Sequence, residues 1–163
     1  MGKFYEQLLE ELTVYTRQIA WLHTAPNPKQ DAANTNNHVD PPMTRLQTLR
    51  AQDAQPDIPA AGPGAYLVDH LFDAGPLVST GQGSAALSWR DMAAWQSGTG
   101  IELQPWEARI VRALSHVYLS SAIAAKSPDC PAPYAEAPAP DQRTRVANSL
   151  RAIFGGLQQK AKK

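Results

Sequence analysis

The residue types that support catalysis or metal binding are scattered along this sequence. The chain has four histidines, His23, His38, His70 and His116. None has a second histidine or a cysteine at the spacing of a zinc site. His70 and Asp73 stand three positions apart, which fits a polar helix edge better than an acid–base pair. The single cysteine, Cys130, lies among prolines without a partner histidine. We therefore expect no metal site and no nucleophile.

Two glycine-rich stretches resemble phosphate-binding loops in composition only. These are Gly62-Pro63-Gly64 and Gly81-Gln82-Gly83-Ser84. Neither follows a predicted strand, and neither ends in the Gly-Lys-Ser/Thr triplet that holds a nucleotide. No serine sits in a Gly-x-Ser-x-Gly elbow. The sequence thus predicts turns at both stretches, no cofactor and no enzymatic activity.

Composition favours a small intracellular protein. The 163 residues are 43% hydrophobic and 18% charged, with fourteen prolines. One cysteine cannot form an internal disulfide, which is typical of a reducing cytoplasm. No apolar run approaches the roughly 18 residues of a membrane span, and the acidic first residues do not resemble a signal peptide. We expect a cytoplasmic location and no membrane partner.

Charge is balanced overall but divided along the chain. Residues 1–107 carry six basic and twelve acidic side chains, whereas residues 108–163 carry nine basic and three acidic ones. Such polarity can steer a partner or favour self-association. A basic C-terminal end also leaves a nucleic-acid-binding regulator as an alternative, although no interleaved aromatics or recognisable reading motif support it.

Residues 3–23 carry the clearest helical pattern. A heptad seam, defined here as apolar residues spaced alternately three and four apart, includes Leu8, Leu12, Tyr15 and Ile19. We expect residues 1–23 to form an N-terminal amphipathic helix whose seam binds a partner. Folding of the same seam onto the rest of the chain is the alternative. Residues 24–63 are predicted to be a proline-rich linker with one short helix, opened by Asp40 and Pro41.

Residues 64–126 are predicted to form a helical core. A short helix is expected at residues 65–74. A second one is expected from Trp89 to about Gly98, with a Ser88–Asp91 capping box at its start. The connection from Leu77 to Leu87 is predicted to be a loop. The longest helix is expected from Pro105 to about Lys126. The expected core anchors are Trp89, Trp106, Ile110, Leu114 and Val117. Trp95 does not share the face of Trp89 and is a candidate partner contact.

The C-terminal part repeats the alternation of linker and seam. Residues 127–140 hold five prolines and are predicted to be a spacer. Residues 141–163 are predicted to be an amphipathic helix with a basic tail, and its seam is Val146, Leu150, Ile153 and Leu157. We expect this seam to bind a helical partner or a second copy. The predicted fold is all-α: a small helical core with flanking helices joined by proline-rich linkers.

One stretch carries a resemblance to a known family. The matching motifs are Ser88-Trp89-Arg90-Asp91-Met92-Ala93-Ala94-Trp95, Thr99-Gly100, Leu103-Gln104-Pro105-Trp106-Glu107 and Val117-Tyr118-Leu119. With this spacing, the segment from Tyr66 to Ser121, about a third of the chain, resembles the tail assembly chaperones of long-tailed bacteriophages and prophages. Its first helix departs from the family pattern, which is often rich in tryptophan there.

The resemblance implies a function without catalysis. A tail assembly chaperone keeps the helical tape-measure protein soluble until the tail tube polymerises around it, and needs neither cofactor nor catalytic residue. The implied partners are the tape-measure protein or other tail proteins, with self-association possible. A structural tail or virion adaptor protein is the alternative from another class.

Overall fold

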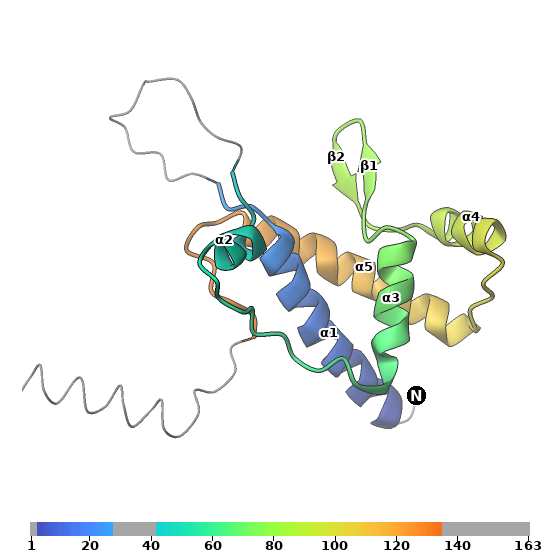
Figure 1. The fold of residues 1–163 in the computed structure, drawn as a ribbon. Helices are drawn as coiled ribbons and strands as arrows, with labels where there is room; N and C mark the ends of the chain where they lie inside the picture. Colours follow the sequence, from blue (N-terminus) through green and yellow to red (C-terminus); the bar gives the residue numbers. More distant parts are fainter. Residues whose placement is uncertain (1–2, 28–41, 135–163) are drawn as a thin grey trace, which may run out of the picture.

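The computed structural model describes residues 3–27 and 42–134, and within them the chain is mainly α-helical (Figure 1). The helices are α1 (Lys3–His23), α2 (Arg45–Ala51), α3 (Ala65–Asp73), α4 (Trp89–Thr99) and α5 (Pro105–Ala125), with a 3-10 turn, η1 (Gly62–Gly64), before α3. Strands β1 (Val78–Thr80) and β2 (Gly83–Ala85) form one small hairpin.

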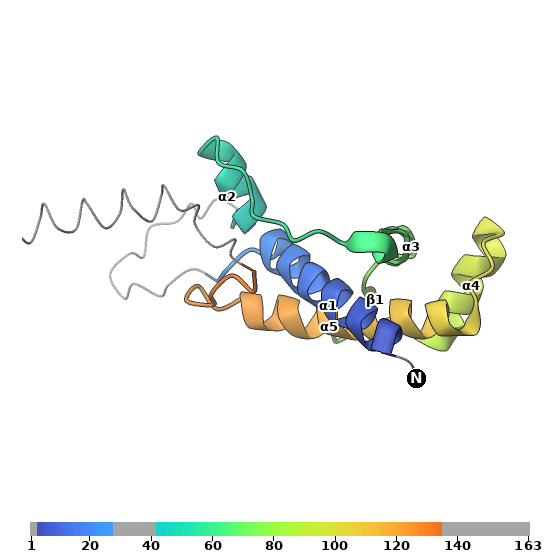
Figure 2. The ribbon, with the colours of Figure 1, turned by 90° about the horizontal axis from the view of Figure 1, so that it is seen from below.

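The centre of the fold is a parallel pair of helices, α1 and α5, which lie side by side along their length (Figures 1 and 2). Helix α3 packs against both. The fully buried Leu12, Leu67 and Leu114 meet where the three helices join. Gly64 allows η1 to approach α1, because a Cβ there would lie only 2.7 Å from a methyl group of Leu8. The main core cluster is thus shared by segments far apart in sequence, and a smaller cluster surrounds Leu22.

The N-terminal seam is part of this core, which corrects the expectation that it faces a partner. Leu8, Leu12 and Ile19 are buried, and the half-buried Tyr15 packs against the same clusters. Helices α3 and α5 supply in the same chain the apolar surface that such a seam requires. Residues 3–23 are therefore not an arm separate from residues 64–126.

Helix ends follow local capping chemistry. The Ser88 backbone N–H donates to Asp91 Oδ2 at 2.8 Å, and Ser88 Oγ accepts the Asp91 N–H at 3.3 Å. Hydrogen bonds from Ser88 hold the pKa of Asp91 below its usual value. Helix α4 ends at Gly100, whose φ of 72° is left-handed and suits glycine. The capping box predicted from the sequence is present.

Two connections differ from their predictions. The expected loop from Leu77 to Leu87 contains the β1–β2 hairpin, in which Val78 pairs with Ala85 in an antiparallel register. Three residues per strand are too few to produce a readable alternation. Thr44 is the N-cap residue immediately before α2, and it forms a capping box with Gln47. The predicted caps at Asp40 and Pro41 lie outside the described residues.

Arg45, at the start of α2, closes the carboxyl end of the α1–α5 pair. Its guanidinium donates to the carbonyl oxygens of Trp21 (3.4 Å), Thr24 (3.3 Å), Ala125 (2.7 Å) and Ser127 (2.9 Å). It also lies 4.7 Å from the centroid of the Trp21 ring. The last carbonyls of a helix lack internal partners and form its negative end. One cation therefore neutralises two parallel helix ends at once.

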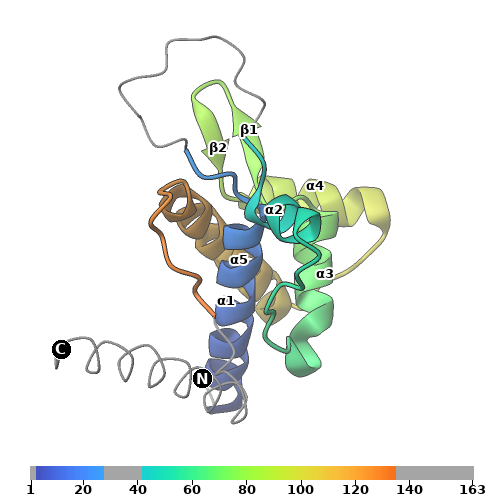
Figure 3. The same ribbon diagram turned by 60° about the vertical axis from the view of Figure 1, so that its left-hand side comes forward.

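The described parts of the proline-rich segments lie against α1. The Gln18 side chain donates to the Asp57 carbonyl at 2.7 Å and accepts the Tyr134 N–H at 3.0 Å. Trp21 Nε1 donates to the Cys130 carbonyl at 3.0 Å. Figure 3 shows the segment after α5 turning back beside α1. These residues therefore contribute to the folded unit.

Candidate binding groove

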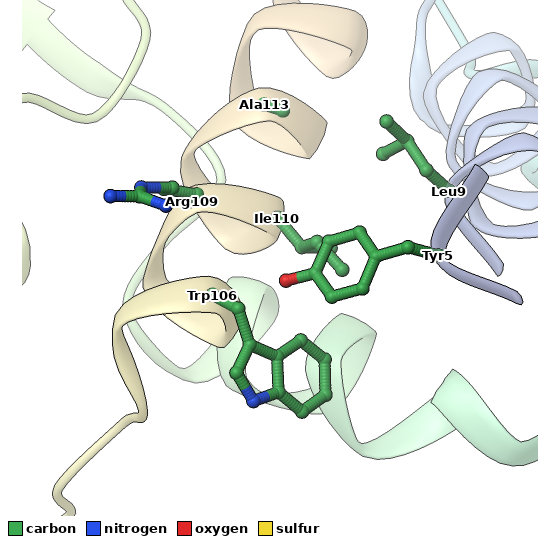
Figure 4. Close-up of a pocket in the computed structure, with 6 residues that line it drawn as sticks. All are labelled: Tyr5, Leu9, Trp106, Arg109, Ile110 and Ala113. Atoms are coloured by element: carbon green, nitrogen blue, oxygen red, sulfur yellow. The ribbon is translucent and has the colours of Figure 1, made fainter. Parts of the chain in front are cut away.

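A hollow lies between the amino-terminal halves of α1 and α5 (Figure 4). We call it the α1/α5 groove and define it by Tyr5, Leu9, Trp106, Arg109, Ile110 and Ala113. Its volume is about 310 Å³, and it opens to the surface. Five of the six lining side chains are apolar or aromatic. The groove can therefore accept apolar side chains from outside the described fold.

The position of the groove follows from the packing of the parallel pair. Helix α3 covers one side of α1 and α5, whereas the described residues leave the other side open at this level (Figure 2). Ile110, which is 2% exposed, joins the groove to the core. Leu9 and Trp106 are half-buried and pack on the same cluster. The groove is thus an uncovered margin of the core.

An aromatic pair bounds one end of the groove. The rings of Tyr5 and Trp106 meet edge to face with centroids 5.2 Å apart. Burial raises the pKa of Tyr5, while the nearby Arg109 acts in the opposite direction. The buried Tyr5 hydroxyl has no hydrogen-bond partner among the described residues. An aromatic pair fixed by packing is suited to anchoring an incoming side chain.

The groove meets a second hollow on α1. This outer hollow is lined by Glu6, Leu9, Glu10, Thr13, Val14 and Arg17, and its volume is about 550 Å³. Leu9 belongs to both hollows. Val14 is 37% exposed, and the carboxylates of Glu6 and Glu10 are at the surface. The two hollows together form an apolar strip whose margin carries these carboxylates and the guanidinium groups of Arg17 and Arg109.

The two tryptophans of α4 have roles opposite to those predicted. Trp89 is not a core residue, because 52% of its surface is exposed. The guanidinium of Arg112 lies over its ring, 5.1 Å from the centroid. Trp89 occupies the first position of α4, and this helix packs at the edge of the fold (Figure 1). Trp95 is half-buried, and its Nε1 donates to Asp73 at 2.8 Å. Trp95 therefore joins α4 to α3 within the fold.

A row of ring contacts strengthens the same junction. His70 lies between Tyr66 and Trp95, with centroid separations of 5.9 and 5.5 Å. The Tyr66 hydroxyl donates to Glu107 at 2.7 Å. Burial, followed by this bond and the carboxylate charge, raises the pKa of Tyr66 to about 12. These contacts give His70 a packing role.

The remaining predicted site residues fall into two groups. Ile110 and Leu114 are buried in the core, and Trp106 and Val117 are half-buried. The C-terminal seam of Val146, Leu150, Ile153 and Leu157 lies outside the described residues. Tyr5 shares the predicted N-terminal heptad pattern, and Ala113 shares the apolar stripe of the predicted longest helix with Trp106 and Ile110, but Leu9 and Arg109 lie outside both patterns. Their proximity arises from the parallel packing of helices about a hundred positions apart.

Tests for other kinds of site are negative within residues 3–27 and 42–134. No three of their His, Cys, Asp and Glu side chains are grouped as metal ligands would be. None of their helices is long and apolar enough to cross a membrane. No family model, curated protein or solved structure matches the chain.

Proposed function

We propose that the protein is a phage tail assembly chaperone-like protein that binds an apolar helix of a client, the tape-measure protein, in the α1/α5 groove. Binding occurs in the host cytoplasm and requires no cofactor. The client helix lies along the parallel pair and places large apolar side chains beside Trp106 and Leu9. Arg109 at the margin attracts an acidic residue of the client.

The single observation that carries this proposal is the open apolar groove on an otherwise packed helix pair. A helix-in-groove complex needs a rigid apolar cleft with a few anchoring side chains. Ile110 provides a buried floor, and the Tyr5–Trp106 pair provides a fixed wall. The resemblance of residues 66–121 to tail assembly chaperones supports the choice of client. Trp106 belongs to both the resembling motif and the groove.

A pair of matched variants tests the proposal. Ala113→Glu places a charged side chain in the groove and keeps a good helix former, whereas Ala94→Glu makes the same change at an exposed position of α4. We expect the wild type and Ala94→Glu to keep a co-expressed tape-measure protein soluble. Ala113→Glu should lose this effect, because a charged, hydrated side chain would fill the apolar groove, and its pairing with Arg109 one helical turn earlier would also remove the cation that attracts the client.

Circular dichroism of both variants provides the folding control. Equal solubilisation by a folded Ala113→Glu would contradict the proposal.

The alternatives predict different observations. A structural tail adaptor would be retained in purified virions, whereas a chaperone would be absent from them. A nucleic-acid-binding regulator would bind DNA with a steep dependence on salt concentration. We expect neither retention nor salt-dependent DNA binding.

A further inference from the structure

We infer that a second copy of this chain covers the α1/α5 groove when no client is bound. A two-fold axis parallel to the helices relates the two copies, so that α1 of each copy lies over α5 of the other. The inference goes beyond the proposed function, because this association needs no client. Three features of the described residues support it: an uncovered face, the placement of its charges and the level of its apolar side chains.

The surface concerned is the side of the α1–α5 pair that points away from α3, which we call the outer face. In Figure 2 no other helix or strand of the described residues crosses the amino-terminal halves of the pair on this side. The groove runs along the middle of the face, with the outer hollow of α1 beside it. Six of the residues that line these hollows define the face: Glu6, Leu9, Glu10, Trp106, Arg109 and Ala113.

The charges of the outer face are divided between the two helices. Helix α1 contributes the exposed carboxylates of Glu6 and Glu10, and α5 contributes the exposed guanidinium of Arg109. Because Tyr5 contacts Trp106 across the pair, Arg109 lies close to the level of Glu6 along the helices. A two-fold axis parallel to the helices preserves this level and exchanges the helices. Arg109 of each copy therefore comes opposite the two carboxylates of the other copy, which forms two sets of attractive contacts.

The same arrangement brings no like charges together along the face. Counted from the groove residues that the two helices share, Arg17 lies about level with the exposed Ser120, and the exposed His116 lies about level with Thr13. An antiparallel arrangement would instead place α5 over α5. Arg109 would then lack a carboxylate, because the Glu107 side chain already accepts the hydrogen bond of Tyr66. Charge thus favours the parallel two-fold axis.

The apolar side chains match under the same axis. The two grooves face each other at one level, so that Leu9 of each copy meets Trp106 of the other and both leave water. From Glu6 to Arg17 the face is about 17 Å long, and two helices are about 20 Å wide. This gives roughly 350 Å² per copy, less than half of the about 800 Å² of a standard interface. The dimer is therefore weak and exchanges readily with the monomer.

Dimerisation would make the second copy a competitor of the client, and this consequence alone rests on the proposed function. The client-free protein would keep its apolar groove covered, and an arriving client helix would displace the second copy. At a concentration at which about nine chains in ten are dimeric, the apparent Kd for the client would be about tenfold weaker than the intrinsic Kd.

Sedimentation equilibrium of the full-length chain tests the association without any client. We expect the wild type to pass from monomer to dimer between about 10 μM and about 1 mM, as a small interface predicts. Arg109→Glu places carboxylates opposite carboxylates, and Glu6→Arg combined with Glu10→Arg places cations opposite cations. Each variant should weaken the dimer at least about tenfold. Arg50→Glu, a charge reversal at an exposed position of α2, is the matched control and should keep the wild-type Kd.

A mixture of the two charge-reversed proteins distinguishes this interface from any other. In the mixed dimer each α1 meets an α5 of opposite charge, so the mixture should associate about as strongly as the wild type. Circular dichroism establishes that both variants are folded. A wild type that stays monomeric at about 1 mM, or a mixture of folded variants that does not associate, overturns the inference.

Dimers that persist in both separate variants would assign the self-association to another surface, which also overturns the inference. None of these results depends on client binding. A protein that dimerises as described but does not bind the tape-measure protein would count against the proposed function alone.

Discussion

The two ends of the α1–α5 pair are built differently. At the carboxyl end, Arg45 binds carbonyls of both helices, and α2 packs against the apolar cluster around Leu22. At the amino end, Tyr5 and Trp106 contact each other across the pair, but the side away from α3 is an open groove. Burial and hydrogen bonding thus close the carboxyl end, while the larger buried cluster, with Leu12 and Leu114, lies on the α3 side of the pair. The open end leaves apolar surface available for binding.

The largest expected effect compares leucines at the two ends. Leu22 is 1% exposed at the closed end, whereas Leu9 is half-buried at the groove. Leu22→Ala should lower the free energy of unfolding by about 2–5 kcal/mol, as truncation of a buried leucine does. Leu9→Ala should cost less than about 2 kcal/mol, since less of its surface leaves water. Chemical denaturation of both variants measures the difference, and equal losses would contradict the comparison.

The next effect concerns the cation at the closed end. Arg45→Ala removes hydrogen bonds from a charged donor to four carbonyls and should cost about 1.5–3 kcal/mol. Arg45→Lys should recover only part of this, because an ammonium group cannot reproduce the planar fork. Arg50→Ala, on the exposed face of the same helix, is the matched control and should stay within about 0.5 kcal/mol of wild type. Equal thermal stability of Arg45→Ala and Arg50→Ala would mean that the closed end does not depend on Arg45.

A smaller effect appears at high pH near the amino end of α5. The pKa of Tyr66 is about 12 in the folded protein, above its ordinary value of 10.0. The folded state therefore holds this proton more tightly, and its stabilising contribution is present below pH 10 and is lost as the pH rises toward 12. Tyr66→Phe should remove this part of the pH dependence. Unfolding free energies of both proteins between pH 9 and about pH 12 measure it, and parallel curves would exclude the effect.

Local features of the fold were predictable from the sequence. The Ser88–Asp91 capping box, the start of α5 at Pro105 and the extent of α1 follow from short-range chemistry, and all three are present. The mainly helical class follows from the same periodicities. The three-residue strands of the hairpin were missed, because such short strands leave no pattern.

Long-range features were not predictable. In the sequence, Arg45 cannot be distinguished from an arginine at any surface position. It has four carbonyl acceptors only because the ends of two helices meet beside it. The N-terminal seam requires an apolar partner, but its spacing does not say whether that partner is in the same chain. The groove likewise needs Leu9 and Ala113 to face each other across separate helices. Trp89 was wrongly assigned to the core because it stands three positions from Met92, which is typical of one helix face. That spacing does not show that Trp89, the first residue of α4, lies at the edge of the fold.

Hydrogen–deuterium exchange of the full-length chain, with and without the tape-measure protein, tests the central claim most directly. We predict that client binding slows exchange in the amino-terminal halves of α1 and α5, which line the groove. Exchange in α2 and at the closed end should stay unchanged. Protection confined to the exposed Trp89 face of α4, or equal protection at both ends of the helix pair, would contradict the assignment of the groove as the binding surface.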